Sequence, residues 1–131
     1  MFPYIETFPY IYFMNQLKKP IRVRLLPDAE EYYAGLDEKT KEKFARSFEK
    51  TEAGIKGKWF KHLSGSNDIW EFRINNQNHF HRMLAFWDNT DNSNTIILGT
   101  HGFNKKTNKT PNHEIQKAEK IKAIYFKSKI R

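Results

Sequence analysis

The feature that most constrains the fold of this chain is a change of periodicity at Lys58. From there onward, apolar and polar residues alternate with a period of two, in runs separated by polar turns. The runs are WFKHL (59–63), IWEFRI (69–74), HFHRMLAFW (79–87) and NTIILGTHGF (94–103). Short turns join neighbouring strands in an antiparallel manner. The sequence therefore predicts a meander of four strands.

Another strand and two helices are predicted before the meander. The run IRVRLL, residues 21–26, alternates like a strand, and Pro27 then opens a short helix. A second helix begins after Asp37, a suitable N-cap, and Gly54 follows its last turn. We interpret the two helices as an N-terminal helical hairpin.

The segment after the meander predicts a C-terminal helix that is rich in lysine. Thr110 is the expected N-cap and Pro111 the first helical residue. Apolar residues follow at helical spacing, at Ile115, Ala118, Ile121 and Tyr125. The predicted fold is α+β, with a small, mainly antiparallel sheet, the helical hairpin and this C-terminal helix.

A chain of 131 residues fits one domain with one core, which we place at residues 21–131. Residues 1–20 are aromatic and do not resemble a signal peptide. We expect them to be an N-terminal extension, with Met14 as an alternative start of translation. An arm or strand that packs on the domain or on a partner is the other interpretation.

Basic residues outnumber acidic ones by 23 to 15, and residues 101–131 hold nine basic and two acidic residues. A positive field of this kind attracts nucleic acid, acidic proteins or anionic lipid. A membrane span is not expected, because no run approaches the roughly 20 apolar residues that it needs. The absence of cysteine excludes disulfides and thiolate metal sites, and is compatible with a cytoplasmic protein.

Two arginines on neighbouring predicted strands form the first candidate site. Alternation places Glu71 and Arg73 on one face of their strand, opposite Trp70 and Phe72. If the register of the next hairpin brings Arg82 to the same face as Arg73, two guanidinium groups lie together. Such a pair suits a phosphate.

The end of the last strand adds more positive charge to this picture. His101 and Phe103 share one face of the strand, and Lys105 and Lys106 follow directly. Packing does not require two adjacent lysines. The cationic groups are therefore expected to converge near one sheet surface, as in a phosphate-binding site.

Simpler interpretations of these residues stay open. Arg73 is also placed to pair with Glu71, two residues away on the strand, and the lysines of the final helix are also suited to a solvated face. His79 and His81 have a spacing that can chelate a metal, but no further ligand completes a set. We therefore expect no metal and no cofactor.

Three segments together carry a resemblance to a known family: KWFKHLSGSNDIWEFRI, HFHRMLAFW and HGFNKKTNKTPNHEIQKAEKI. Over residues 21–126 the chain resembles the phage-derived, HigB-type branch of the RelE/ParE toxin superfamily, toxins of type II toxin–antitoxin modules. The resemblance rests on the W-E-F-R strand, the following H-R strand and the H-x-F-x-K-K-T-x-K-T-P junction. One departure is His81, where related sequences often have tyrosine. The implied fold is the RelE-like fold.

The resemblance implies cleavage of messenger RNA on the ribosome, without metal, by attack of a 2′-hydroxyl on the adjacent phosphate. Arg73 and Arg82 match the positions expected to hold the scissile phosphate. Lys105 and Lys106 match a basic pair expected to stabilise charge or to protonate the leaving oxygen. Two further catalytic candidates are His101, as a proton shuttle, and Glu71, as a base or to orient an arginine. The candidates for RNA binding are Lys109, Lys117 and Lys120.

The resemblance also implies partners and leaves two other functions open. It implies a cognate helix-turn-helix antitoxin, operator DNA bound through that antitoxin, and the ribosome with its messenger RNA. The main alternative is a ParE-like toxin that inhibits gyrase without cutting RNA. A silent module that only binds its antitoxin and operator DNA is the third.

Overall fold

A computed structural model describes residues 19–106 and 109–129 of the chain. The elements, in chain order, are β1 (Ile21–Leu25), α2 (Pro27–Ala34), α3 (Glu38–Glu52), β2 (Phe60–His62), β3 (Trp70–Asn76), β4 (His79–Asp88), β5 (Thr95–Lys105) and α4 (Asn112–Lys129). The expected N-terminal extension, with the alternative start at Met14, falls mostly on residues that lie outside the described part. None of the described helices is long and apolar enough to cross a membrane.

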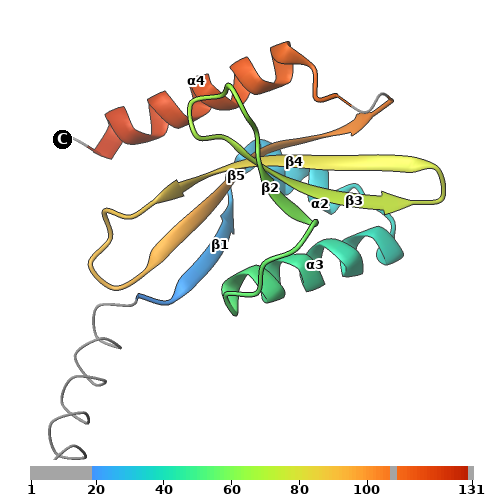
Figure 1. Ribbon diagram of the computed structural model, residues 1–131, viewed down its shortest axis with the longest axis horizontal. Helices are drawn as coiled ribbons and strands as arrows, with labels where there is room; N and C mark the ends of the chain where they lie inside the picture. The colour runs from blue at the N-terminus through green and yellow to red at the C-terminus, as the bar shows by residue number, and fades with distance from the viewer. Residues whose placement is uncertain (1–18, 107–108, 130–131) are drawn as a thin grey trace, which may run out of the picture.

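The five strands form one twisted sheet in the order β1-β5-β4-β3-β2 (Figure 1). The strands β2 to β5 pair with their sequence neighbours in antiparallel fashion, so the predicted meander is confirmed. The strand β1 joins the outer edge of β5 and runs parallel to it. The sheet is therefore mixed.

Helices cover both faces of the sheet and bury a core on each. The helix α4 lies across one face, and α2 and α3 lie on the other (Figure 1). On the α3 side, Phe44 packs in a fully buried cluster with Phe72 and Met83. On the α4 side, Ala118 packs against a cluster that contains Leu84 and Phe86. The alternation of each strand sends successive side chains into these two cores.

The prediction of the fold was right about the α+β class but wrong about the N-terminal helical hairpin. The strand β1 comes before both helices, and α2 has only eight residues. The helix α2 packs mainly on β5 and also touches β1, whereas α3 packs on β1 and β3. The ring of Tyr33 contacts that of Phe44 where the two helices meet. The apolar residues of each helix are buried against the sheet. The result is two helices on a mixed sheet rather than a hairpin beside an antiparallel one.

The expected N-cap of the last helix was also wrong. The helix α4 begins at Asn112, and the carbonyl of Pro111 accepts hydrogen bonds from the backbone of Glu114 and Ile115, at 3.1 and 3.3 Å. The hydroxyl of Thr110 donates instead to the carboxylate of Glu71. A buried carboxylate needs donors, and Thr110 meets that need.

Candidate functional site

The two arginines lie directly opposite each other on neighbouring strands. Arg73 of β3 pairs in register with Arg82 of β4, on the face of the sheet that α4 covers. The tight turn between these strands sets this register, and its central residues Gln77 and Asn78 have φ of 49° and 65°. Positive φ at both positions is typical of the two-residue hairpin turns that match strand twist. The turn therefore brings the guanidinium groups together.

The carboxylate of Glu71 lies beside both arginines. One of its oxygens, Oε1, accepts a hydrogen bond from Nε of Arg73 at 3.1 Å and lies 3.8 Å from Nε of Arg82. The other oxygen accepts from Thr110. The side chain of Glu71 is fully buried. Because both of its carboxylate oxygens are engaged, Glu71 is suited to orienting the two arginines.

The two guanidinium groups differ in exposure. The side chain of Arg73 is 38% exposed and that of Arg82 is 8% exposed. One terminal nitrogen of Arg82 donates to Oδ1 of Asn75 at 3.1 Å and to the carbonyl of His81 at 2.8 Å. Its Nε has no hydrogen-bond acceptor in the described part of the chain. Burial lowers the pKa of Arg82 from its ordinary value, yet an arginine keeps its charge in proteins.

A hollow of about 440 Å³ opens over this pair. Its lining consists of Lys58, Trp59, Arg73, Asn75 and Arg82. The partly exposed Arg73 and the hydrogen-bonded, nearly buried Arg82 thus face a space that can admit an anion. Guanidinium groups bind phosphate oxygens in bidentate fashion.

The last residue of β5 joins this cluster. Lys105 lies across from Phe80 and is 4% exposed. Burial lowers its pKa from the ordinary value, the charges of Arg82 and Arg73 lower it further, and the charge of Glu71 opposes them. A lysine with a lowered pKa can exchange a proton nearer to neutral pH than an ordinary lysine.

Other residues expected in the site lie elsewhere. His101 is buried, and its Nε2 lies 2.8 Å from Oε1 of Glu114 on α4. Burial lowers the pKa of His101, the bond to Glu114 raises it, and its other charged neighbours are Lys117 and Asp28. The structure therefore places His101 in a network between β5, α4 and α2, and not with the arginines.

The remaining expected lysines are on the surface. Lys106 and Lys109 are exposed on either side of residues 107–108, which lie outside the described part. Lys117 lies 3.7 Å from Asp28 of α2, and Lys120 is exposed on α4. Of the predicted residues, the structure thus brings together Glu71, Arg73, Arg82 and Lys105.

Two contributors to the site escaped the sequence analysis. Asn75 was counted only as part of a turn, although alternation already places it on the face of Arg73, two residues along. Thr110 was assigned to a helix cap because threonine before proline is a common helix-start signal. Its contact with Glu71 joins residues 39 apart in the chain, and no local pattern indicates it.

The two histidines of the HFH run bond to protein groups. Nδ1 of His81 lies 2.6 Å from the hydroxyl of Tyr32, and Nδ1 of His79 lies 3.0 Å from the side-chain nitrogen of Asn104. Among the described residues, no group of three or more metal-ligating side chains is close enough to hold an ion.

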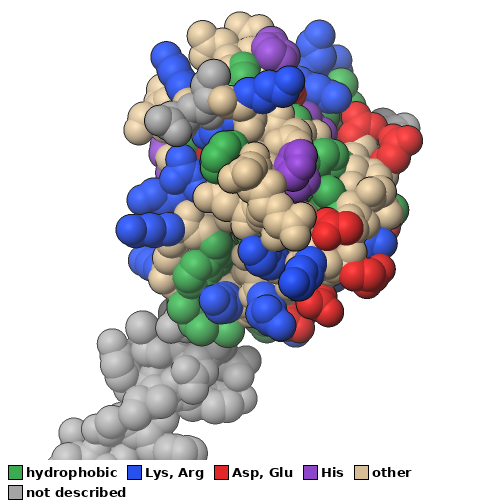
Figure 2. All heavy atoms as spheres, turned by 90° about the vertical axis from the view of Figure 1, so that its right-hand side faces the viewer, with side chains coloured by type: hydrophobic (Ala, Val, Ile, Leu, Met, Phe, Trp, Pro, Cys, Tyr) green, Lys and Arg blue, Asp and Glu red, His purple; other side chains and the backbone are tan. Residues whose placement is uncertain are grey.

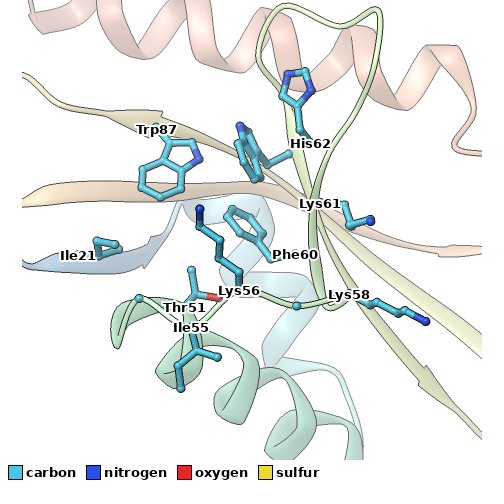
Figure 3. Close-up of a pocket in the computed structure, with 12 residues that line it drawn as sticks. Ile21, Thr51, Ile55, Lys56, Lys58, Phe60, Lys61, His62 and Trp87 are labelled. Atoms are coloured by element: carbon cyan, nitrogen blue, oxygen red, sulfur yellow. The ribbon is translucent and has the colours of Figure 1, made fainter.

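A second hollow, of about 580 Å³, lies on the α3 side of the sheet (Figure 3). Lys56 directs its amine across it toward Phe60 and Trp87, and Thr51 and Ile55 form the opposite wall (Figure 3). This hollow is mainly apolar, and it shares Lys58 with the hollow over the arginines. It is therefore a neighbouring space with a different chemical character.

Comparison with known protein families identifies the family of the chain. Residues 31–123 match the sequence model of the family described as Phage derived protein Gp49-like (DUF891). This match covers β3, β4, β5 and their junction with α4, the elements that carry the arginine cluster. No curated protein matches the chain. Since the match spans most of the sequence, the chain belongs to the Gp49-like family of phage-derived proteins, a toxin-like family of toxin–antitoxin systems.

Proposed function

We propose that this protein is the toxin of a type II toxin–antitoxin module and cuts messenger RNA on the ribosome without a metal ion. The observation that carries the proposal is the cross-strand pair of Arg73 and Arg82, with Lys105 beside it. Arg73 and Arg82 line one open hollow together with Lys58, and these cationic side chains suit the charge that develops on a phosphate under attack. Membership of a toxin-like family agrees with this activity.

The reaction uses the RNA's own nucleophile. The 2′-oxygen attacks the adjacent phosphorus, and the bond from phosphorus to the 5′-oxygen breaks on the opposite side. The products are a 2′,3′-cyclic phosphate and a 5′-hydroxyl. Arg73 and Arg82 hold the non-bridging oxygens and stabilise the extra negative charge of the five-coordinate phosphorus.

Two protons must move during this reaction, one from the 2′-hydroxyl and one to the leaving 5′-oxygen. We assign one transfer to Lys105, because its pKa is lowered and it lies with the arginines. Lys106 is exposed beside it and is assigned to the RNA backbone. Glu71 is a positioning residue, which keeps the arginines at the hollow.

A toxin-like protein implies an antitoxin, and we propose that it is a helix-turn-helix protein that also bridges the toxin to operator DNA. The substrate complex is the ribosome with its messenger RNA, which places the activity in the cytoplasm.

The test is cleavage of a messenger RNA held on purified ribosomes, with the cut mapped by primer extension. The wild-type protein should cut in the presence of a chelator, and replacing the attacking 2′-hydroxyl by hydrogen should abolish that cut. Arg73→Ala and Arg82→Ala should each lower the rate about 10²-fold or more, as loss of a transition-state charge partner does.

Arg22→Ala is the matched control, because Arg22 is an exposed arginine on β1, at the other edge of the sheet. It should cut at the wild-type rate. Full activity of both site variants, or cleavage that needs a divalent metal, would refute the proposed mechanism.

A further inference from the structure

Basic side chains continue from the arginine pair around the open edge of β3. The strand β2 pairs with residues 70–72, and the backbone N–H of Arg73 still donates to the carbonyl of Trp59 at 2.8 Å, so β3 from residue 74 onward is an edge of the sheet. We propose that the basic row on α3, defined as Lys43, Arg46 and Lys50, binds the backbone of the messenger RNA next to the scissile phosphate. The inference rests on the proposed function and extends its site to a second element.

The spacing of the row follows from helix geometry. Residues 43, 46 and 50 are three and four apart, so they lie along one side of α3. Phe44 and Phe48 of the same helix point into the core with Phe72, which turns the basic row toward the edge of β3. Burial of the apolar stripe thus fixes where the positive charges lie.

The row is continuous with the candidate site. A hollow of about 230 Å³ is lined by Lys43, Arg46, Ser47 and Lys50 of α3 and by Arg73, Ile74 and Asn75 of β3. Arg73 and Asn75 also line the hollow over the arginine pair. The two hollows therefore share a wall. An RNA strand with one phosphate at Arg73 reaches the second hollow directly.

The charge of this surface suits a polyanion. Among the described residues that line the two hollows, six are basic and none is acidic. Lys43, Arg46 and Lys50 form no ion pair with any described acidic residue, although Glu42 and Glu49 are on the same helix. In Figure 2, which looks at the end of the molecule that carries the β3–β4 turn, basic side chains gather on the left and below and acidic ones on the right.

Two members of the row also have structural contacts. Nζ of Lys43 donates to the backbone carbonyl of Asn75 at 3.0 Å, which satisfies an open group of the β3 edge. Nζ of Lys50 lies 4.8 Å from the centre of the Trp59 ring. Because only Lys43 donates a hydrogen bond to the backbone of β3, it is left unchanged in the test, and Arg46 and Lys50 are the residues to replace.

The experiment measures binding of a short single-stranded RNA to the double variant Arg46→Gln/Lys50→Gln in the Arg82→Ala background, in which cleavage is slow. Affinity should fall about 3- to 30-fold at physiological salt. The slope of log affinity against log salt should fall by about 0.7 for each phosphate that the variant no longer neutralises. The charge-matched control is Arg22→Gln/Arg24→Gln on β1, whose two arginines are exposed at the far edge of the sheet, and it should bind like its parent.

Cleavage measured on ribosomes with Arg82 restored then separates the row from the catalytic pair. The double variant should need more substrate for half-maximal rate but reach nearly the wild-type rate at saturation. A lower rate at saturation with unchanged affinity would overturn the inference. Because RNA binding is measured separately from cleavage, the row can be verified even if the protein proves not to be a nuclease.

Two further outcomes would assign the row to another partner. Weaker binding to ribosomes without messenger RNA, with unchanged binding to the short RNA, would overturn the inference in favour of ribosomal RNA. Unchanged RNA binding with weaker binding of the protein encoded next to the toxin would overturn it in favour of an acidic segment of that protein.

Discussion

At the scale of single residues, the candidate site is a small group of like charges kept together by one carboxylate. Arg73, Arg82 and Lys105 repel one another, and Arg82 and Lys105 are nearly buried. Glu71, fully buried among them, supplies the opposing charge. Such an arrangement costs stability when the hollow is empty and becomes favourable when a phosphate enters, because the anion neutralises the excess charge.

This balance predicts a large effect of Glu71→Gln on stability. The variant should lower the free energy of unfolding by about 3 kcal/mol, because it leaves one partly exposed and two nearly buried cations without their counter-charge. Urea denaturation followed by circular dichroism measures the change. Asp68→Asn is the control, since the bond of Asp68 to His62 is exposed, and it should change stability by less than about 0.5 kcal/mol. A loss below about 1 kcal/mol in Glu71→Gln would show that the carboxylate does not hold the cluster together.

At the scale of elements, close packing against β5 fixes the position of α2. Gly102 of β5 lies under the ring of Tyr32, where an added Cβ would come within 2.1 Å of a ring atom. Tyr32 in turn bonds to His81 of β4 through its hydroxyl. The helix is thus fixed to two strands by one tyrosine, and the glycine allows this close approach.

Gly102→Ala should therefore displace Tyr32 and lower the free energy of unfolding by about 1–3 kcal/mol, the usual cost of overpacking. Gly35→Ala is the matched control at the end of α2. Its φ of −85° suits alanine, and an added Cβ there meets nothing closer than 3.7 Å. That variant should be neutral or slightly more stable. Equal stability of the two variants, measured by thermal unfolding, would contradict the close contact between α2 and β5.

At the scale of the whole molecule, a buried and a half-buried histidine, one on each face of the sheet, make the stability depend on pH. His101 lies on the α4 side, bonded to Glu114, and His81 lies on the α2 side, bonded to Tyr32. Burial lowers the pKa of both imidazoles from their ordinary value. The unfolded chain then takes up protons at a higher pH than the folded protein.

The free energy of unfolding should consequently fall as the pH drops below about 6.5, the ordinary value for histidine. Well above that pH both histidines are neutral in both states and contribute no slope. His101→Gln/His81→Gln should flatten the curve between about pH 6.5 and 5, although each substitution also costs some stability. Burial raises the pKa of Asp88, but hydrogen bonds from Lys129, Thr90 and Tyr125 lower it well below the ordinary value, so this group acts only at lower pH. A double variant that keeps the full slope above pH 5 would exclude the histidines as its source.

The sequence alone was sufficient for the features that depend on local periodicity. The meander, the first strand and the α+β class follow from local periodicity, whereas the pairing of Arg73 with Arg82 was predicted only on the condition of one hairpin register, which the structure shows. Because side chains alternate strictly along a strand, the register of one turn determines which residues share a face. These features needed no knowledge of distant contacts.

Tertiary structure alone decided the rest. The parallel pairing of β1 with β5, the packing of α2 mainly on β5 and of α3 on β1 and β3, and the contact of Thr110 with Glu71 join residues far apart in the chain. Lys105 is buried with the arginines, whereas His101, four residues earlier on the same face, is held by α4. Packing of apolar faces and the demand of buried charges for partners are properties of the assembled molecule. These properties decide between tertiary arrangements that the local sequence pattern does not distinguish.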